Sequence, residues 1–189
     1  MTSYGVDLYW LPLGAGGHSV RFNGRVYEAF AAAVDRRSRC ALYHSALEVN
    51  VPEGRFVIEM TPAVGGGDGD HGVVAGGAVG SRLLARTNLF RYEVRCWRDG
   101  HIPDVAEAVE SPRRVSEDEM LARRVLQLAP LVPTPTWGRD ELKTGDMWNS
   151  NSLVSWLLVS AEIGVGRAPI PAGGRAPGWD AGVAVATRA

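Results

Sequence analysis

Cysteine and lysine are scarce in this sequence, and long apolar runs are absent. The 189 residues include only two cysteines and a single lysine, Lys143. Two cysteines cannot build the disulfide framework of a small secreted domain. No stretch approaches the ~20 consecutive apolar residues of a membrane-spanning helix, so we expect no membrane partner. Because the first residues contain neither a basic nor an apolar targeting segment, we expect a cytoplasmic protein.

An excess of charge of one sign is also absent. Twenty basic and 21 acidic residues give a formal net charge of −1. Binding to nucleic acid through counterion release needs a concentrated basic surface, so we expect no nucleic-acid partner. A hydrophobic content of 46% excludes disorder as the main state. The length fits a single domain spanning residues 1–189, and the sequence leaves the oligomeric state open.

The spacing of apolar residues predicts a mixture of helices and antiparallel strands. Alternation of apolar and polar residues is typical of strands, and a spacing of three or four is typical of helices. The expected strands cover residues 6–11, 40–51, 55–61, 89–97 and 178–186. The expected helices cover residues 25–34, 104–109, 117–128 and 151–162. We therefore predict an α+β fold in which helices pack on an antiparallel sheet.

Turn and cap residues mark the ends of several of these elements. Pro52, Glu53 and Gly54 supply turn chemistry between the strands at 40–51 and 55–61, which predicts a hairpin. Ser116 and Glu119 have the spacing of a capping box at the start of a helix. Residues 65–80 consist almost entirely of Gly, Asp, Val and Ala, which predicts a mobile surface loop.

One candidate for chemistry is the polar run that leads into the helix at 151–162. The residues are Asn149, Ser150, Asn151 and Ser152. A hydroxyl at a helix start lies near unpaired backbone N–H groups and the positive end of the helix dipole. These groups stabilise an attacking anion and the oxyanion that follows, and the Asn149 and Asn151 amides add further donors. Ser and Asn are also preferred N-cap residues, so capping alone explains the same pattern.

A second candidate is His44, which lies within the strand at 40–51. Strand alternation places His44 on the same face as Ala46 and Glu48, while Tyr43 and Leu47 point to the opposite, more apolar face. A semi-polar face suits a cleft in which the imidazole acts as a base. The alternative is a structural histidine whose ring nitrogens are satisfied within the sheet.

Taken together, the two segments resemble a known superfamily. The strand sequence Y-H-S-A-L-E-V around His44, followed about a hundred residues later by the helix-opening N-S-N-S, resembles the circularly permuted papain-like proteins. Relatives include the PPPDE-type thiol isopeptidases and the lecithin retinol acyltransferase group. Their histidine strand precedes the nucleophile helix, which typically opens with Asn-Cys-Asn. The resemblance covers two short windows and implies a permuted papain-like fold with Ser150 as nucleophile and His44 as base.

The chain departs from that superfamily by carrying serine where cysteine is expected. A thiol ionises near pH 8.5, whereas Ser150 must lose its proton to His44 during the attack. Neither Cys40, at the start of the histidine strand, nor Cys96, on an apolar strand face, replaces the thiol. We expect a hydrolase or acyl-transfer enzyme that acts on an amide or ester of a small-molecule or peptide substrate, without metal or other cofactor. The alternative is a catalytically inactive papain-like binding protein.

The residue that orients the histidine is expected on the next strand, where Glu59 is the candidate. A tight turn at Glu53 and Gly54 pairs Glu48 with Glu59 and places both carboxylates on the face of His44. Four residues of strand separate Glu48 from His44 by ~13 Å, so contact with Glu59 requires a shifted register. Asp146 is a second candidate for this role.

Three further sequence features give weaker indications of a binding site. Residues 67–72 (G-D-G-D-H-G) contain oxygen and nitrogen ligands but match no standard metal-binding loop, so we expect a flexible loop. Residues 13–18 are glycine-rich but lack the Lys-Ser/Thr ending of a phosphate-binding loop, which favours a simple turn. Trp148, beside Ser150, is expected in the wall of a cleft.

Overall fold

A computed structural model describes residues 4–13, 40–63 and 72–188 of the protein. The helix expected at 25–34 therefore lies outside the described residues, as does the glycine-rich turn after Leu13. Among the described residues, no helix is both long and apolar enough to cross a membrane.

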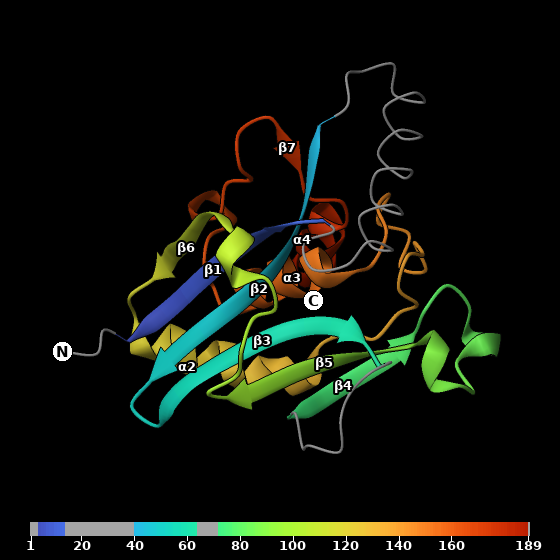
Figure 1. Ribbon diagram of the computed structural model, residues 1–189, viewed down its shortest axis with the longest axis horizontal. Coiled ribbons are helices and arrows are strands. Elements are labelled where there is room, and N and C mark those ends of the chain that lie inside the picture. Colours follow the sequence, from blue (N-terminus) through green and yellow to red (C-terminus); the bar gives the residue numbers. More distant parts are fainter. Residues whose placement is uncertain (1–3, 14–39, 64–71, 189) are drawn as a thin grey trace.

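The described residues form a mostly antiparallel sheet of seven strands with helices on one face, which confirms the α+β prediction (Figure 1). The strand order is β4-β5-β3-β2-β1-β6, and β7 pairs in parallel with β2. The strands are β1 (Gly5–Pro12), β2 (Ala41–Val51), β3 (Gly54–Pro62), β4 (Val73–Ala78), β5 (Arg91–Arg98), β6 (Val109–Ser116) and β7 (Gly174–Arg175). The helices are α2 (Glu119–Leu128), α3 (Ser150–Ser160) and α4 (Trp179–Arg188).

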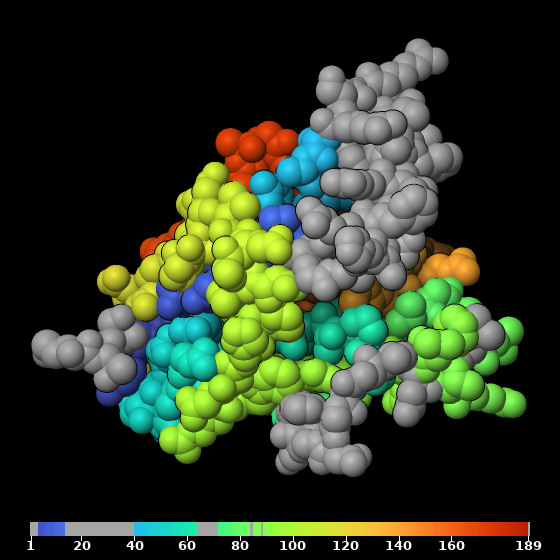
Figure 2. Space-filling view, in the orientation of Figure 1, coloured from blue at the N-terminus to red at the C-terminus, as the bar shows by residue number. Residues whose placement is uncertain are grey.

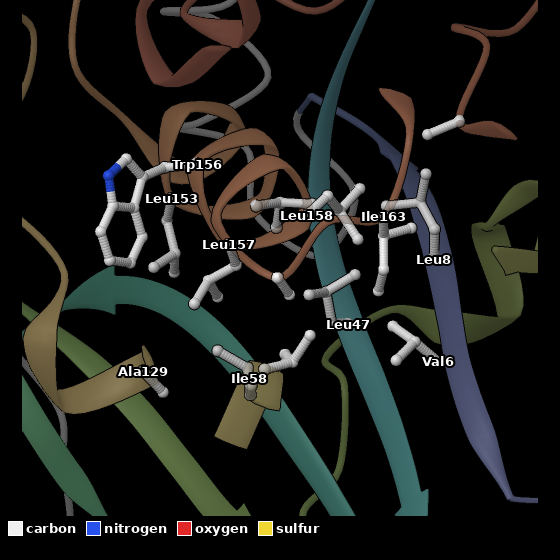
Figure 3. Packing of buried hydrophobic residues seen from close by; sticks show 14 of the residues in the cluster. Val6, Leu8, Leu47, Ile58, Ala129, Leu153, Trp156, Leu157, Leu158 and Ile163 are labelled. Atoms are coloured by element: carbon white, nitrogen blue, oxygen red, sulfur yellow. The ribbon is translucent and has the colours of Figure 1, made fainter. Parts of the chain in front are cut away.

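The main core lies between the sheet and α3 (Figure 3). Leu153, Leu157 and Leu158 of α3 meet Leu47 of β2 and Ile58 of β3, and all five side chains are fully buried. Each buried side chain of this size contributes roughly 1.5–3 kcal/mol relative to an exposed one. Because α4 packs on its other side, α3 is enclosed along most of its length, which holds its first turn in a fixed position.

The opposite face of the sheet is covered by the segment that joins β5 to β6, which is yellow-green in Figure 2. In this segment, Ile102 packs against a second, smaller cluster of buried side chains on the sheet. These are Tyr9, Leu11, Ala46 and Val57. The two faces of the sheet therefore carry separate apolar clusters.

One expected element near the edges of the sheet is wrong, and another is shorter than expected. Residues 65–80 were expected to form only a loop, but Val73–Ala78 pairs with β5 as the edge strand β4, while residues 64–71 lie outside the described residues. A Cβ atom at Gly77 would lie only 2.6 Å from the ring of Tyr92, so the small residues allow this close approach. The short helix expected at 104–109 is present as a 3₁₀ helix that covers only Val105–Glu107, and β6 begins at Val109 and pairs with β1.

The strand expected at 178–186 is also wrong, because these residues lie in α4. A Cβ atom on Gly182 would collide with the Ser152 carbonyl and the Ser155 hydroxyl of α3. The Ser155 hydroxyl donates to the Trp179 carbonyl at 2.7 Å. The small residues of this segment therefore allow two helices to pack closely, and they show no strong periodicity in the sequence.

The helix expected after Ser116 is confirmed as α2, but its cap is different. The N-cap is Asp118, whose carboxylate accepts from the Met120 N–H at 2.7 Å and the Leu121 N–H at 3.2 Å. Ser116 ends β6 instead, and its hydroxyl accepts from the Asp118 N–H.

Candidate functional site

A cavity lies where β2 and β3 separate. The two strands pair from Val51 and Gly54 at the hairpin turn to Leu47 and Ile58, and beyond this point β2 follows β1 while β3 follows β5 (Figure 1). The cavity has a volume of about 490 Å³. Five of the residues singled out from the sequence line it: His44, Glu59, Asn149, Ser150 and Asn151.

Ser150 is the first residue of α3, and Asn149 is its N-cap. The Asn149 side-chain oxygen accepts from the Asn151 N–H at 2.9 Å and the Ser152 N–H at 3.4 Å, while the Ser152 hydroxyl accepts from the Asn149 N–H. Capping therefore explains Asn149 and Ser152. Capping does not involve Ser150, which is only 5% exposed. Its N–H and its hydroxyl have no hydrogen-bond partner among the described residues.

Asn151 does not supply the side-chain donor for an oxyanion that the sequence led us to expect. Its side-chain nitrogen donates to the Tyr43 carbonyl at 2.9 Å and to the Pro177 carbonyl at 2.8 Å. Its side-chain oxygen accepts from the Ser45 hydroxyl at 2.8 Å. Both amide hydrogens are therefore used, and Asn151 instead ties the start of α3 to β2.

Asn149 retains one amide hydrogen for a ligand. Its side-chain nitrogen donates to the Pro177 carbonyl at 2.8 Å, and an amide group has two hydrogens to donate. Asn149 is half-buried and lines the cavity. Of the two asparagines, Asn149 is thus the one with a donor to spare.

His44 lies on the face of β2 predicted from strand alternation. Tyr43 and Leu47 point into the main core, whereas Ala46 belongs to the cluster on the opposite face. His44 is half-buried, and burial lowers its pKa to about 4, an effect partly opposed by the negative charge of Asp104. The imidazole is therefore neutral at pH 7. Its ring has no hydrogen bond to any residue in the described part of the chain, including Ser150.

The expected pairing of Glu48 with Glu59 is wrong. The hairpin turn places Glu48 opposite Val57, and the Glu48 carboxylate is paired with Arg55 at 3.0 Å. The pairing of β2 with β3 ends at Leu47 and Ile58, so Glu59 lies just beyond the paired part of the hairpin. Glu59 has no hydrogen bond to His44, so it does not orient the imidazole in this structure.

Asp104 is an acidic residue of the site that the sequence analysis missed. It precedes the 3₁₀ turn at Val105–Glu107 with a left-handed φ of 58° and lines the same cavity as His44. Asp tolerates this backbone conformation better than most residues do. Nothing in the sequence connects this loop with the histidine strand, because the sheet alone brings the two segments together.

Two other expectations about the site are wrong. Trp148 is only 2% exposed and belongs to the main core, while Trp137 lines the cavity instead. The Asp146 carboxylate accepts from the Met147 N–H at 2.8 Å and the Gly178 N–H at 2.6 Å. Asp146 therefore fixes the loop before α3 and does not orient His44.

Comparisons with known proteins give this chain no family. No protein-family model matches it, and no curated protein or solved structure is significantly similar to it. Within residues 4–13, 40–63 and 72–188, no group of three His, Cys, Asp or Glu side chains is placed to hold a metal ion. The interpretation of the site therefore depends on the chemistry of the side chains in the cavity.

Proposed function

We propose that the protein is a papain-like hydrolase or acyl-transfer enzyme that attacks an amide or ester through Ser150, with His44 as the general base. The observation that carries the proposal is that these two residues, far apart in the sequence, line one cavity. Further support comes from the Ser150 N–H at the start of a buried helix, which has no partner among the residues that the structure describes, and from the neutral imidazole of His44.

In the proposed reaction, the Ser150 hydroxyl oxygen bonds to the carbonyl carbon while His44 accepts the hydroxyl proton. The Ser150 N–H donates to the resulting oxyanion, and the remaining Asn149 amide hydrogen is available as a second donor. When the intermediate collapses, the carbon bond to the amine or alcohol breaks and that leaving group takes the proton from His44. Water or another nucleophile then attacks the acyl carbon while His44 accepts its proton, the bond from that carbon to the Ser150 oxygen breaks, and the oxygen takes the proton back from His44.

The electrostatics of His44 fit this role. A group that must accept a proton has to be neutral at the working pH, and burial keeps His44 neutral. The imidazolium formed during the attack is stabilised by the nearby negative charge of Asp104. Hydrogen bonds between catalytic groups are often long or unformed in empty sites and tighten when substrate binds. On this basis, the missing hydrogen bond between Ser150 and His44 is compatible with catalysis.

The second candidate is a binding protein that keeps the cavity without the reaction. It is favoured by the deep burial of Ser150 and by the same missing hydrogen bond between Ser150 and His44. In this case, ligands would bind in the cavity and leave unchanged.

Labelling with a serine-reactive fluorophosphonate separates the two candidates. We expect the wild-type protein to be labelled and Ser150→Ala to remain unlabelled. His44→Gln should react at least 10²-fold more slowly, the lower end of the usual contribution of a general base. Ser160→Ala, at the other end of α3, is the matched control and should be labelled like the wild type. Equal labelling of the wild type and Ser150→Ala, or no labelling of the wild type, would contradict catalysis by Ser150.

A restored thiol provides an independent readout. Burial raises the pKa of Cys96 to about 11, but both native cysteines are only partly buried, so both are first replaced by alanine. In that background, we expect Ser150→Cys to react with iodoacetamide near pH 7, because a helix N-terminus lowers the pKa of a thiol. An unreactive thiol would favour the binding protein.

A further inference from the structure

Glu59 is a buried acidic residue whose carboxylate has no partner in the described part of the chain. It is only 8% exposed and lines the cavity, yet it forms no hydrogen bond or ion pair with any of the described residues. Buried carboxylates in proteins are nearly always paired or hydrogen-bonded, because an isolated buried charge is costly. Burial accordingly raises the pKa of Glu59, and the charge of Arg95 offsets this only in part. The side chain is therefore arranged to receive a donor from outside the sheet.

Arg95 is the nearest candidate for an internal partner, but it is held elsewhere. It lies opposite Glu59 in the register of β3 and β5. Its guanidinium donates twice to the Glu93 carboxylate, at 3.1 and 2.9 Å. The same guanidinium lies over the Trp97 ring, 5.2 Å from the centroid. These contacts account for the position of Arg95 and leave the Glu59 carboxylate facing the cavity.

The remainder of the cavity wall has a negative and apolar character. Asp104 contributes a second carboxylate, and His44 is neutral at pH 7. The described residues that line the cavity include no arginine or lysine. The apolar part of the wall includes Leu42, Met60 and Trp137. A ligand that complements this wall combines a positive charge with an apolar body.

We propose that the cavity binds a primary amine, with the ammonium group on Glu59 and an attached apolar chain against Leu42, Met60 and Trp137. The inference rests on the proposed function, since it makes the substrate an amide or ester that carries such an amine. One or two carboxylates suffice to bind an ammonium ion, which donates three hydrogen bonds. Within the described residues, the donors needed to hold a metal ion in the same place are not grouped together.

Isothermal titration calorimetry with hexylammonium chloride tests the inference, with 1-hexanol as the uncharged probe of similar size. For the wild-type protein, we expect hexylammonium to bind at least tenfold more tightly than hexanol. Glu59→Gln keeps the shape of the side chain and removes its charge, so hexylammonium should bind this variant at least tenfold more weakly. Ser160→Ala, at the end of α3 away from the cavity, should bind hexylammonium as the wild type does.

The outcomes separate this inference from the proposed function. Equal affinities for hexylammonium and hexanol, or no binding of hexylammonium, would overturn the amine site, and this comparison requires only the wild-type protein. Unchanged affinity in a folded Glu59→Gln variant would also overturn it. If Ser150 proves unreactive while binding of hexylammonium depends on Glu59, the proposed reaction fails and the amine site stands.

Discussion

Replacing Asn151 by alanine tests how the site is held together. The side chain is 1% exposed and forms hydrogen bonds with the Tyr43 carbonyl, the Pro177 carbonyl and the Ser45 hydroxyl. The Pro177 carbonyl still accepts a hydrogen bond from Asn149 in this variant, so the loss of the bond from Asn151 costs little. The other two buried groups lose a partner, at a cost of about 1–3 kcal/mol each. We therefore expect Asn151→Ala to lower the free energy of unfolding by roughly 2–6 kcal/mol.

Urea unfolding followed by tryptophan fluorescence measures this loss, provided that the slope with denaturant is unchanged. Ser45→Ala is the matched control, because it removes only one of the hydrogen bonds and leaves a single buried group without its partner, at a cost of about 1–3 kcal/mol. The double variant should lose about 1 kcal/mol less stability than the sum of the losses in the two single variants, because the two residues share one hydrogen bond. A loss below 1 kcal/mol for Asn151→Ala, or strict additivity in the double variant, would refute the structural role assigned to Asn151.

Two further predictions concern stability. Burial lowers the pKa of His44 to about 4, so the unfolded chain takes up this proton at a higher pH than the folded protein does. Stability should therefore fall as pH drops from about 6.5 to 4, by at most about 3 kcal/mol. Urea unfolding at pH 7 and 4.5 should show a smaller difference for His44→Gln, and an equal difference would contradict the pKa. Leu157→Ala empties part of the main core and should cost about 2–5 kcal/mol in the same assay, whereas Met120→Ala, at a 73% exposed position, should stay within about 0.5 kcal/mol. An unchanged unfolding midpoint for Leu157→Ala would show that this core is wrongly placed.

Features that depend on neighbouring residues were predictable from the sequence. The turn at Pro52 and Glu53 joins β2 to β3 as expected, because turn residues act over a few positions. The strand expected at 89–97 is confirmed as β5, with Tyr92 and Val94 buried in the main core. Strand alternation placed His44 correctly on the face opposite Leu47. In these cases, local geometry and burial favour the same arrangement.

Segments of small residues were not predictable in the same way. Residues 73–78 and α4 are rich in Gly, Ala and Val, which give little contrast between a buried and an exposed face. Their structure depends on their partners, because Gly77 lies against Tyr92 and Gly182 lies against α3. A strand or a helix at such positions is selected by how closely the neighbouring element can approach.

For the site, the sequence by itself determined which side chains are capable of the chemistry: an imidazole at His44 and a hydroxyl at Ser150, at the start of a helix. Only the tertiary structure decided which of their neighbours are available. Asn151 is consumed by hydrogen bonds to β2 and the Pro177 carbonyl, whereas Glu59 and the distant Asp104 line the cavity. The reason is physical: hydrogen bonds and register join groups that are remote along the chain, and local patterns contain no information about such pairs.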